Sequence, residues 1–202
     1  MPGILALDLS TSIGWAVLDE KETVLDYGTI ATAKPVLSYG LYPWCYLFMA
    51  DELALHILGL VDRLKPTSVI IEETNLGKSR YAQKALEFIH SAVLRTLIRT
   101  HRGWVRYVSS SAWRRALNLQ LTAEDRRANG KLSKAKRRAK DMNTKLDKKA
   151  LGVRGRVGKK HLSVRWVNNT YNLGLKMKDD DIADAICLGV GFLRGAETCT
   201  GE

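Results

Sequence analysis

Cysteine and histidine are rare in this chain, and neither is arranged as a zinc site. The 202 residues include four histidines that form no cluster and three cysteines, Cys45, Cys187 and Cys199. An odd number of cysteines without metal-type spacing argues against a disulfide scaffold and is typical of reduced core thiols in a cytosolic protein. We therefore expect neither a disulfide framework nor a zinc centre.

Long apolar runs are also missing from the sequence. No run reaches the roughly 18 residues that a transmembrane helix requires, and no signal peptide is visible. We therefore expect a protein of the cytoplasm that has no membrane partner.

Acidic residues are scarce in one segment. Residues 126–165 contain 16 Lys and Arg but only Asp141 and Asp147 as acids, a local charge of +14. The rest of the chain has 16 basic and 19 acidic residues, or −3, so the total of +11 is concentrated in this segment. A dense cationic segment on a nearly neutral body is typical of a nucleic-acid binder. The alternative is a solvated basic tail, which the ordered-looking sequence after it disfavours.

The apolar pattern predicts one α/β domain over residues 1–202. Three strands joined by short polar links are expected first, and such links favour antiparallel neighbours. Two strands that alternate with helices follow, which together predict a mixed five-stranded sheet flanked by helices. The expected elements are strands at Ile4–Leu9, Ile13–Leu18 and Thr23–Ile30, a helix at about 42–64, a strand at Ser68–Glu73, a helix at Lys78–His101 and a strand at Trp104–Ser109.

The C-terminal half is predicted to be mainly helical. A short helix capped by Ser110 or Ser111 is followed by a basic insertion at about 120–158, which glycines should divide into helical pieces joined by mobile loops. A helix through Trp166 and a last helix, which Asp181 opens and whose apolar stretch is Ile182–Leu193, complete the chain. The tryptophans are expected in the core or in a dimer interface.

Four carboxylates lie where buried elements should carry no charge. Asp8 and Glu72 each follow an apolar run of the kind that forms a strand buried on both faces. Asp181 and Asp184 are three residues apart at the start of an apolar stretch, which places them on one face of a helix. Because a cluster of acids in such surroundings needs a cation, the four residues predict a metal site.

Each acid also has an ordinary structural interpretation. Asp8 can simply end a strand. Glu72 is adjacent to Glu73, and alternation along a strand sends only one of the two to the site. The acidic run 179–181 would stabilise the first turn of a helix through capping and the helix dipole. Asp184 resists that interpretation because it lies between two alanines on a strongly apolar helix.

The segments ILALDLSTSIGWAVLD, SVIIEETN and DDDIADAICLG resemble the three acidic motifs of RuvC-type Holliday-junction resolvases, which are RNase H-like nucleases. The resemblance covers roughly residues 3–117 and 159–193 and matches the basic stretch between them poorly. It implies an RNase H-like fold with the family's four acids on strand one, at the end of strand four and in the D-x-x-D-A motif of the last helix. The catalytic and metal-binding residues that it implies are Asp8, Glu72, Asp181 and Asp184.

This resemblance implies an endonuclease that resolves four-way DNA junctions with two Mg²⁺ ions, for which Mn²⁺ would substitute. Two divalent ions about 3.5–4 Å apart generate the nucleophile and relieve charge on the attacking and leaving oxygens. Magnesium prefers carboxylate and water oxygens, which is the ligand set predicted above. The family also implies a homodimer, for which the 78–101 helix is the candidate interface, and packing of that helix on the sheet is the alternative. A compact resolvase with a basic insertion would suit a virus or phage.

Basic residues are expected to bring DNA to the metals. Lys78 and Arg80 follow the fourth strand and could contact phosphates there, although they could equally be ordinary solvated charges before a helix. Lys159 and Lys160 precede the last acidic motif and are expected to contact DNA. The aromatic wedge that the family often has after its glutamate is missing, and Leu76 is the candidate in its place. The insertion is expected to add phosphate contacts, or alternatively to be a partner-binding or targeting arm, through Lys134, Lys136, Arg137, Arg138 and Lys140.

Two other functions fit parts of the sequence. Residues 8–14 resemble the phosphate loop of sugar-kinase and actin-like ATPases, but those enzymes need two related domains, which 202 residues barely accommodate. A non-catalytic DNA-binding module would explain the basic segment. It would leave four buried acids unexplained, and acids near DNA are costly without metal ions.

Overall fold

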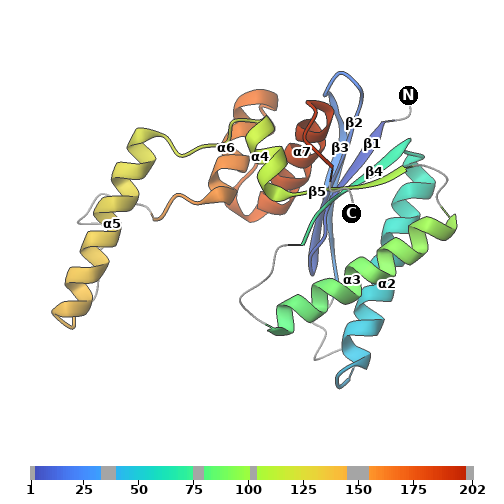
Figure 1. Cartoon of the computed structure of the whole chain (residues 1–202), viewed down its shortest axis with the longest axis horizontal. Helices are drawn as coiled ribbons and strands as arrows, with labels where there is room; N and C mark the ends of the chain where they lie inside the picture. Colours follow the sequence, from blue (N-terminus) through green and yellow to red (C-terminus); the bar gives the residue numbers. More distant parts are fainter. Residues whose placement is uncertain (1–2, 33–39, 75–79, 101–103, 145–154, 199–202) are drawn as a thin grey trace.

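The computed structural model describes residues 3–32, 40–74, 80–100, 104–144 and 155–198. Its strands are β1 (Ile4–Asp8), β2 (Ser12–Leu18), β3 (Val24–Ala31), β4 (Ser68–Glu72) and β5 (Trp104–Val108). They form one mixed sheet in the order β3-β2-β1-β4-β5 (Figure 1). The first three are antiparallel neighbours, whereas β4 and β5 run parallel to β1, which confirms the predicted fold class.

Helices cover both faces of this sheet (Figure 1). One face is covered by α2 (Trp44–Leu64) and α3 (Arg80–Thr100), and the other by α4 (Ser110–Ala116), α6 (Lys159–Tyr171) and α7 (Asp180–Leu193). A short 3-10 helix, η1 (Met177–Asp179), leads into α7. The remaining helix, α5 (Ala123–Asp141), stands away from both layers.

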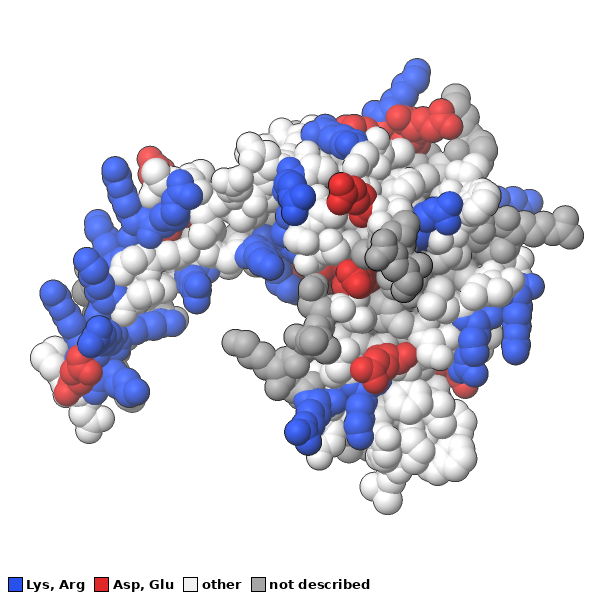
Figure 2. All heavy atoms as spheres, in the orientation of Figure 1, with Lys and Arg blue, Asp and Glu red and all other residues white. Residues whose placement is uncertain are grey.

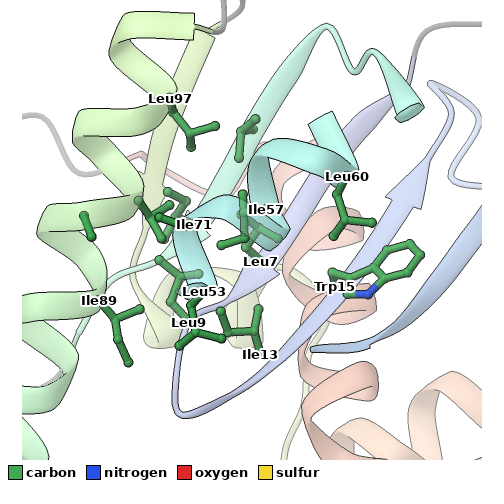
Figure 3. Packing of buried hydrophobic residues seen from close by; sticks show 14 of the residues in the cluster. Leu7, Leu9, Ile13, Trp15, Leu53, Ile57, Leu60, Ile71, Ile89 and Leu97 are labelled. Carbon is green, nitrogen blue, oxygen red and sulfur yellow. The ribbon is translucent and has the colours of Figure 1, made fainter. Parts of the chain in front are cut away.

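The side chains of β1 alternate between two hydrophobic cores. Leu5 and Leu7 point to the α2 and α3 side, whereas Ile4 and Ala6 point to the α7 side. Figure 3 shows the first core, in which Leu7 lies among side chains of both helices and neighbouring strands. Each fully buried Leu or Ile in these cores contributes about 1.5–3 kcal/mol. Both faces of the central strand are therefore apolar, and only its carboxyl end is open to polar chemistry.

Helix α2 has the length and composition of a membrane span. It has 21 residues and a mean hydropathy of 1.4 over its most apolar window, although charged residues interrupt it. Its inner face, which includes Leu53 and Ile57, is buried against the sheet and α3. This is the only helix of the described residues with these properties.

The structure corrects two sequence predictions in the C-terminal half. The N-cap of α4 is Ser109, whose hydroxyl accepts a hydrogen bond from Ala112 N at 3.2 Å, and not Ser110 or Ser111. Residues 123–141 form one continuous helix instead of short pieces, because a capping box at Thr122 starts it and Gly130 is tolerated on an exposed face. The tryptophans divide: Trp15 and Trp113 are buried as expected, but Trp44 and Trp104 are 59% and 67% exposed.

Two glycines let α7 lie close across the sheet. A Cβ atom on Gly14 would overlap the carbonyl of Asp181, and one on Gly189 would overlap the side chain of Leu18. Gly14 pairs with Asp8 in the register of β1 and β2. The first turn of α7 is therefore held beside the carboxyl end of β1.

Helix α5 is attached to the body through side chains. Arg165 of α6 donates two hydrogen bonds to Asp125, at 2.9 and 3.0 Å, and Asn129 exchanges two with the backbone of Val157, both at 2.9 Å. The hydrogen bonds from Arg165 and from the Thr122 amide hold the pKa of Asp125 well below its usual range. Because the folded-state pKa is lowered, the stability from this attachment is fully present above the ordinary Asp pKa of about 3.9 and is lost as the pH falls through the lowered folded-state pKa.

Replacing Arg165 by Gln should loosen α5 without unfolding the sheet. The bidentate ion pair is lost, so amide hydrogen exchange across residues 123–141 should accelerate by about tenfold or more, while β1 keeps its protection. Arg194→Gln is the matched control, because it removes a similar bidentate pair with Glu22 far from α5. Equal exchange rates in α5 for both variants would contradict the attachment.

Candidate active site

A cavity of about 400 Å³ opens at the carboxyl ends of β1 and β4. Parallel pairing of these strands brings Asp8 and Glu72 to one edge of the sheet, and α7 adds Asp181 and Asp184. The structure therefore brings together, around one cavity, all four acids that the sequence singled out. Glu73 also reaches the rim, but its side chain is exposed.

Asp8 is the most strongly perturbed of the four acids. Burial raises its pKa well above the usual range, and the negative charges of Glu72, Asp184 and Asp181 raise it further. Lys160 opposes these effects only in part. A carboxylate held among like charges in this way is suited to a bound cation, because the cation relieves the repulsion.

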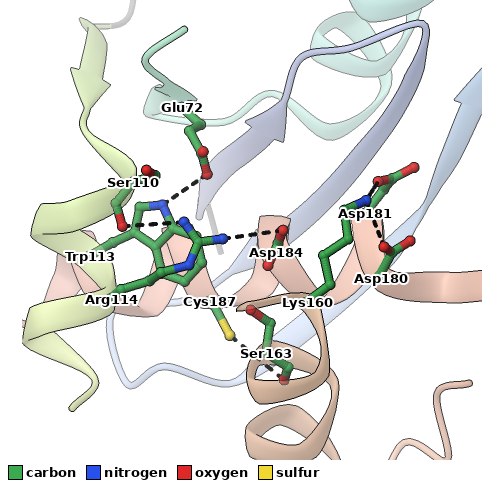
Figure 4. A network of polar contacts seen from close by, with 10 residues as sticks. All are labelled: Glu72, Ser110, Trp113, Arg114, Lys160, Ser163, Asp180, Asp181, Asp184 and Cys187. Atoms are coloured by element: carbon green, nitrogen blue, oxygen red, sulfur yellow. Dashed lines mark hydrogen bonds and ion pairs between the residues drawn. The ribbon is translucent and has the colours of Figure 1, made fainter. Parts of the chain in front are cut away.

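Glu72 is held by the indole of a buried tryptophan. The Trp113 Nε1 atom donates a hydrogen bond to Glu72 Oε2 at 2.9 Å (Figure 4). Burial raises the pKa of Glu72, and so does Asp184, whereas Arg114 and the Trp113 hydrogen bond lower it. Because an indole is a donor only, it favours the ionised form of Glu72 and engages one of its two oxygens.

Asp184 is buried, with 5% of its surface exposed. Its Oδ2 atom accepts a hydrogen bond from Arg114 at 3.4 Å, and its Oδ1 atom is buried without a hydrogen-bond partner in the described part of the chain. Burial raises its pKa, while the Ser163 hydroxyl, Arg114 and Lys160 lower it. A buried carboxylate oxygen without a donor is a suitable ligand for a hard cation.

The two aspartates in the first turn of α7, Asp180 and Asp181, both pair with Lys160 of α6. The Lys160 Nζ atom lies 2.6 Å from Asp180 Oδ2 and 3.1 Å from Asp181 Oδ1 (Figure 4). Burial lowers the pKa of Lys160, but the hydrogen bonds to both aspartates outweigh this effect and raise it overall. Lys160 therefore remains charged and neutralises part of the acidic cluster.

The donor set fits a divalent metal such as Mg²⁺. All four acids offer carboxylate oxygens, which are the ligands that Mg²⁺ prefers, and Asp184 Oδ1 is buried without a hydrogen-bond partner among the described residues. No three His, Cys, Asp or Glu side chains within the described ranges already form a compact metal cage. Instead, Arg114 and Lys160 lie against the acids.

Trp113, Arg114 and Asp180 are site residues that the sequence pattern does not predict. The apolar context of Trp113 predicts packing alone, and its hydrogen bond to Glu72 spans 41 positions of the chain, while Arg114 reaches Asp184 across 70. No local pattern reveals contacts of this range. Asp180 was visible only as part of an acidic run, whose helix-capping interpretation gave no hint of its pairing with Lys160.

The predicted DNA-binding residues fall into three groups. Lys159 and Lys160 line the cavity, and Arg80 begins α3. Lys78 and the candidate wedge Leu76 lie outside the described residues. The predicted residues of the basic insertion are exposed on α5, where Figure 2 shows Lys and Arg covering the projecting helix: Lys134, Lys136, Arg137, Arg138 and Lys140.

Replacing Trp113 by Phe should weaken divalent-metal binding by roughly 10- to 100-fold, as is typical when a group that orients a metal ligand is lost. The phenyl ring keeps part of the packing of the buried indole, but the hydrogen bond to Glu72 is lost. Calorimetric titration with Mn²⁺ measures the effect. Trp166→Phe is the control, because Trp166 packs beside Tyr171 on α6 and contacts no acid of the cavity. Equal Mn²⁺ affinities for both variants would contradict the role of Trp113.

Comparison with known proteins identifies the fold. No family model and no curated protein sequence matches the chain. Among solved structures, Thermus thermophilus RuvC in complex with a Holliday junction substrate is 14% identical, with 95% of this chain and 92% of that chain covered at a TM-score of 0.53. A second Thermus thermophilus RuvC structure is 13% identical, with 93% and 91% covered at a TM-score of 0.58.

A third similar structure is the yeast mitochondrial Holliday junction resolvase Ydc2, which is 12% identical, with 96% of this chain and 78% of that chain covered at a TM-score of 0.53. The chain therefore has the RuvC-type fold of these structures. The match extends over nearly the whole chain.

Proposed function

We propose that this protein is a metal-dependent, structure-selective endodeoxyribonuclease that resolves four-way DNA junctions. The observation that carries the proposal is the convergence of Asp8, Glu72, Asp181 and Asp184 around one cavity of a RuvC-type fold. A non-catalytic DNA-binding module does not account for four acids around one cavity, and an ATPase site uses only one or two carboxylates beside the nucleotide phosphates. The nuclease accounts for all four acids.

The four acids would hold Mg²⁺, or Mn²⁺ in its place. The bound ions would relieve charge on the attacking and leaving oxygens of the phosphodiester. Trp113 orients Glu72 through its indole N–H, and Asp8 ends a strand that is buried on both faces, which holds its carboxylate at the wall of the cavity. Lys159 and Lys160 lie on the wall of the same cavity and are placed to bind DNA phosphates.

The direct test compares cleavage of a four-way junction, a flap and a linear duplex of matched sequence in Mg²⁺ and in EDTA. We expect paired nicks in the junction, little cutting of the duplex and none in EDTA. Equal cutting of junction and duplex would reject structure selectivity. Failure to cut any of the three in Mg²⁺ or Mn²⁺ would reject the nuclease.

We also propose that the protein acts as a homodimer, since a four-way junction has approximate two-fold symmetry and needs two matched nicks. The apolar face of α3 is not available for this purpose, because Ala85, Ile89 and Leu97 are buried in the core and Phe88 stacks on Tyr46. An interface on α3 would have to use its outward face, where Tyr81 and Ile98 are exposed. Sedimentation of a monomer both free and on a junction would reject the dimer. The cytoplasmic location and the viral or phage source stay predictions.

A further inference from the structure

Two cations lie against the acids that are proposed to hold metal. Arg114 contacts Asp184 Oδ2 at 3.4 Å, and Lys160 contacts Asp181 Oδ1 at 3.1 Å. Figure 4 shows both side chains directed at the acidic cluster, Arg114 from α4 and Lys160 from α6. The guanidinium of Arg114 also stacks over the Trp113 ring, 3.9 Å from its centroid, and donates to the Ser110 carbonyl at 3.3 Å.

These ion pairs oppose metal binding. A divalent ion placed on Asp184 or Asp181 would share its ligand with a positive charge that repels it, so the pair must be weakened before the ion is bound at full strength. Without any cation, however, the four acids would repel one another, because they carry like charges around one cavity. Arg114 and Lys160 thus neutralise part of the negative charge of the four acids, but they compete with a metal ion for the same carboxylate oxygens.

DNA offers both cations another anionic partner. Both side chains line the cavity. Guanidinium and ammonium groups bind phosphate oxygens through charge-assisted hydrogen bonds. Lys160 has 55% of its side chain exposed and can swing outward, whereas Arg114, with 14% exposed, needs only a small movement within the cavity. A phosphate entering the site would therefore draw both cations away from the carboxylates.

We propose that Arg114 and Lys160 are exchangeable counter-ions, which pair with the acids in the DNA-free protein and with phosphates in the complex. DNA and divalent metal should then each strengthen the binding of the other. This inference rests on the proposed function, because it requires that the cavity binds both. It adds that the enzyme reaches its full metal affinity only when DNA is bound, so that less metal binds to the DNA-free protein.

The coupling is measured on the wild-type protein without relying on cleavage. Fluorescence anisotropy of a labelled four-way junction gives the DNA affinity in EDTA and in Ca²⁺, a hard cation that takes the same oxygen ligands. Calorimetry gives the Ca²⁺ affinity with and without junction, after subtraction of a titration of junction alone. Ca²⁺ should raise the affinity for the junction by the same factor by which the junction raises the affinity for Ca²⁺, since coupling is reciprocal. We expect this coupling ratio to be at least about fivefold. A ratio of one would overturn the exchange.

Variants test which residues carry the coupling. Arg114→Gln and Lys160→Gln should each tighten Ca²⁺ binding to the DNA-free protein about fivefold and reduce the coupling ratio, because a competing charge is gone. Arg115→Gln is the matched control, as Arg115 lies on the same helix but is exposed and lines a different cavity. Unchanged or weaker Ca²⁺ binding in both test variants would overturn the proposal. If Arg114→Gln does not fold, the half-exposed Lys160→Gln carries the test.

The two proposals fail in different ways. If no divalent ion binds to the folded wild type or to any variant, with or without DNA, the proposed function fails. If metal binds and the junction is cut, but the coupling ratio is one, the nuclease stands and the counter-ion exchange is rejected.

Discussion

Asp184→Asn should lose cleavage of a four-way junction by about three orders of magnitude or more in Mg²⁺, because metal-assisted hydrolysis supplies several kcal/mol and each 1.4 kcal/mol corresponds to about tenfold in rate. Binding of the junction should persist, since the substitution removes a metal ligand but no cationic contact. The amide keeps an oxygen that can accept from Arg114, and it removes a buried negative charge, so the fold should survive. Single-turnover cleavage and anisotropy on the same preparation check both parts.

Asp26→Asn is the matched control for this experiment. It makes the same chemical change on β3, where Asp26 is an exposed partner of Arg63 and does not line the cavity. Cleavage by this variant should equal that of the wild type. Cleavage at the wild-type rate by Asp184→Asn would exclude Asp184 from the site, and loss of DNA binding together with cleavage would indicate a structural role instead.

Removing five cations from α5 should flatten the salt dependence of DNA binding. Each phosphate contact contributes about 0.9 to the slope of log affinity against log salt, so the loss of five contacts would reduce the slope by up to about 4.5. Binding to all DNA shapes should weaken, while turnover at saturating DNA should change little because α5 lies apart from the cavity. The variant replaces by Ala the residues Lys134, Lys136, Arg137, Arg138 and Lys140.

The control for the α5 variant removes exposed cations elsewhere. Lys21 and Lys65 lie beyond the strand ends opposite Asp8, and Arg99 lies in the last turn of α3. Their replacement by Ala should leave the slope unchanged. If the α5 variant also kept the wild-type slope, the helix would serve another purpose, such as binding a protein partner or targeting.

The basic segment contains α5 and the start of α6, and the sequence predicted α6 better than α5. Around residue 162, apolar residues at helical spacing predicted a helix, and α6 is present there. In 123–141 the glycine favoured broken pieces, yet one helix forms. The capping box and the good helix formers of α5 stabilise the helix through local contacts. Leu132, Asp125 and Asn129 stabilise its position through contacts that exist only in the folded chain.

What the sequence by itself determined is the mixed five-stranded sheet, the antiparallel pairing of its first three strands and the four candidate acids. Alternating and continuous apolar runs have local periods, and an acid at the end of such a run is visible because burying its charge there is costly. Only the tertiary structure decided how those acids are held. The indole of Trp113 on Glu72, the guanidinium of Arg114 on Asp184 and the ammonium of Lys160 on Asp181 join elements far apart in the chain. Such pairings depend on how helices pack across the sheet, which no local spacing encodes.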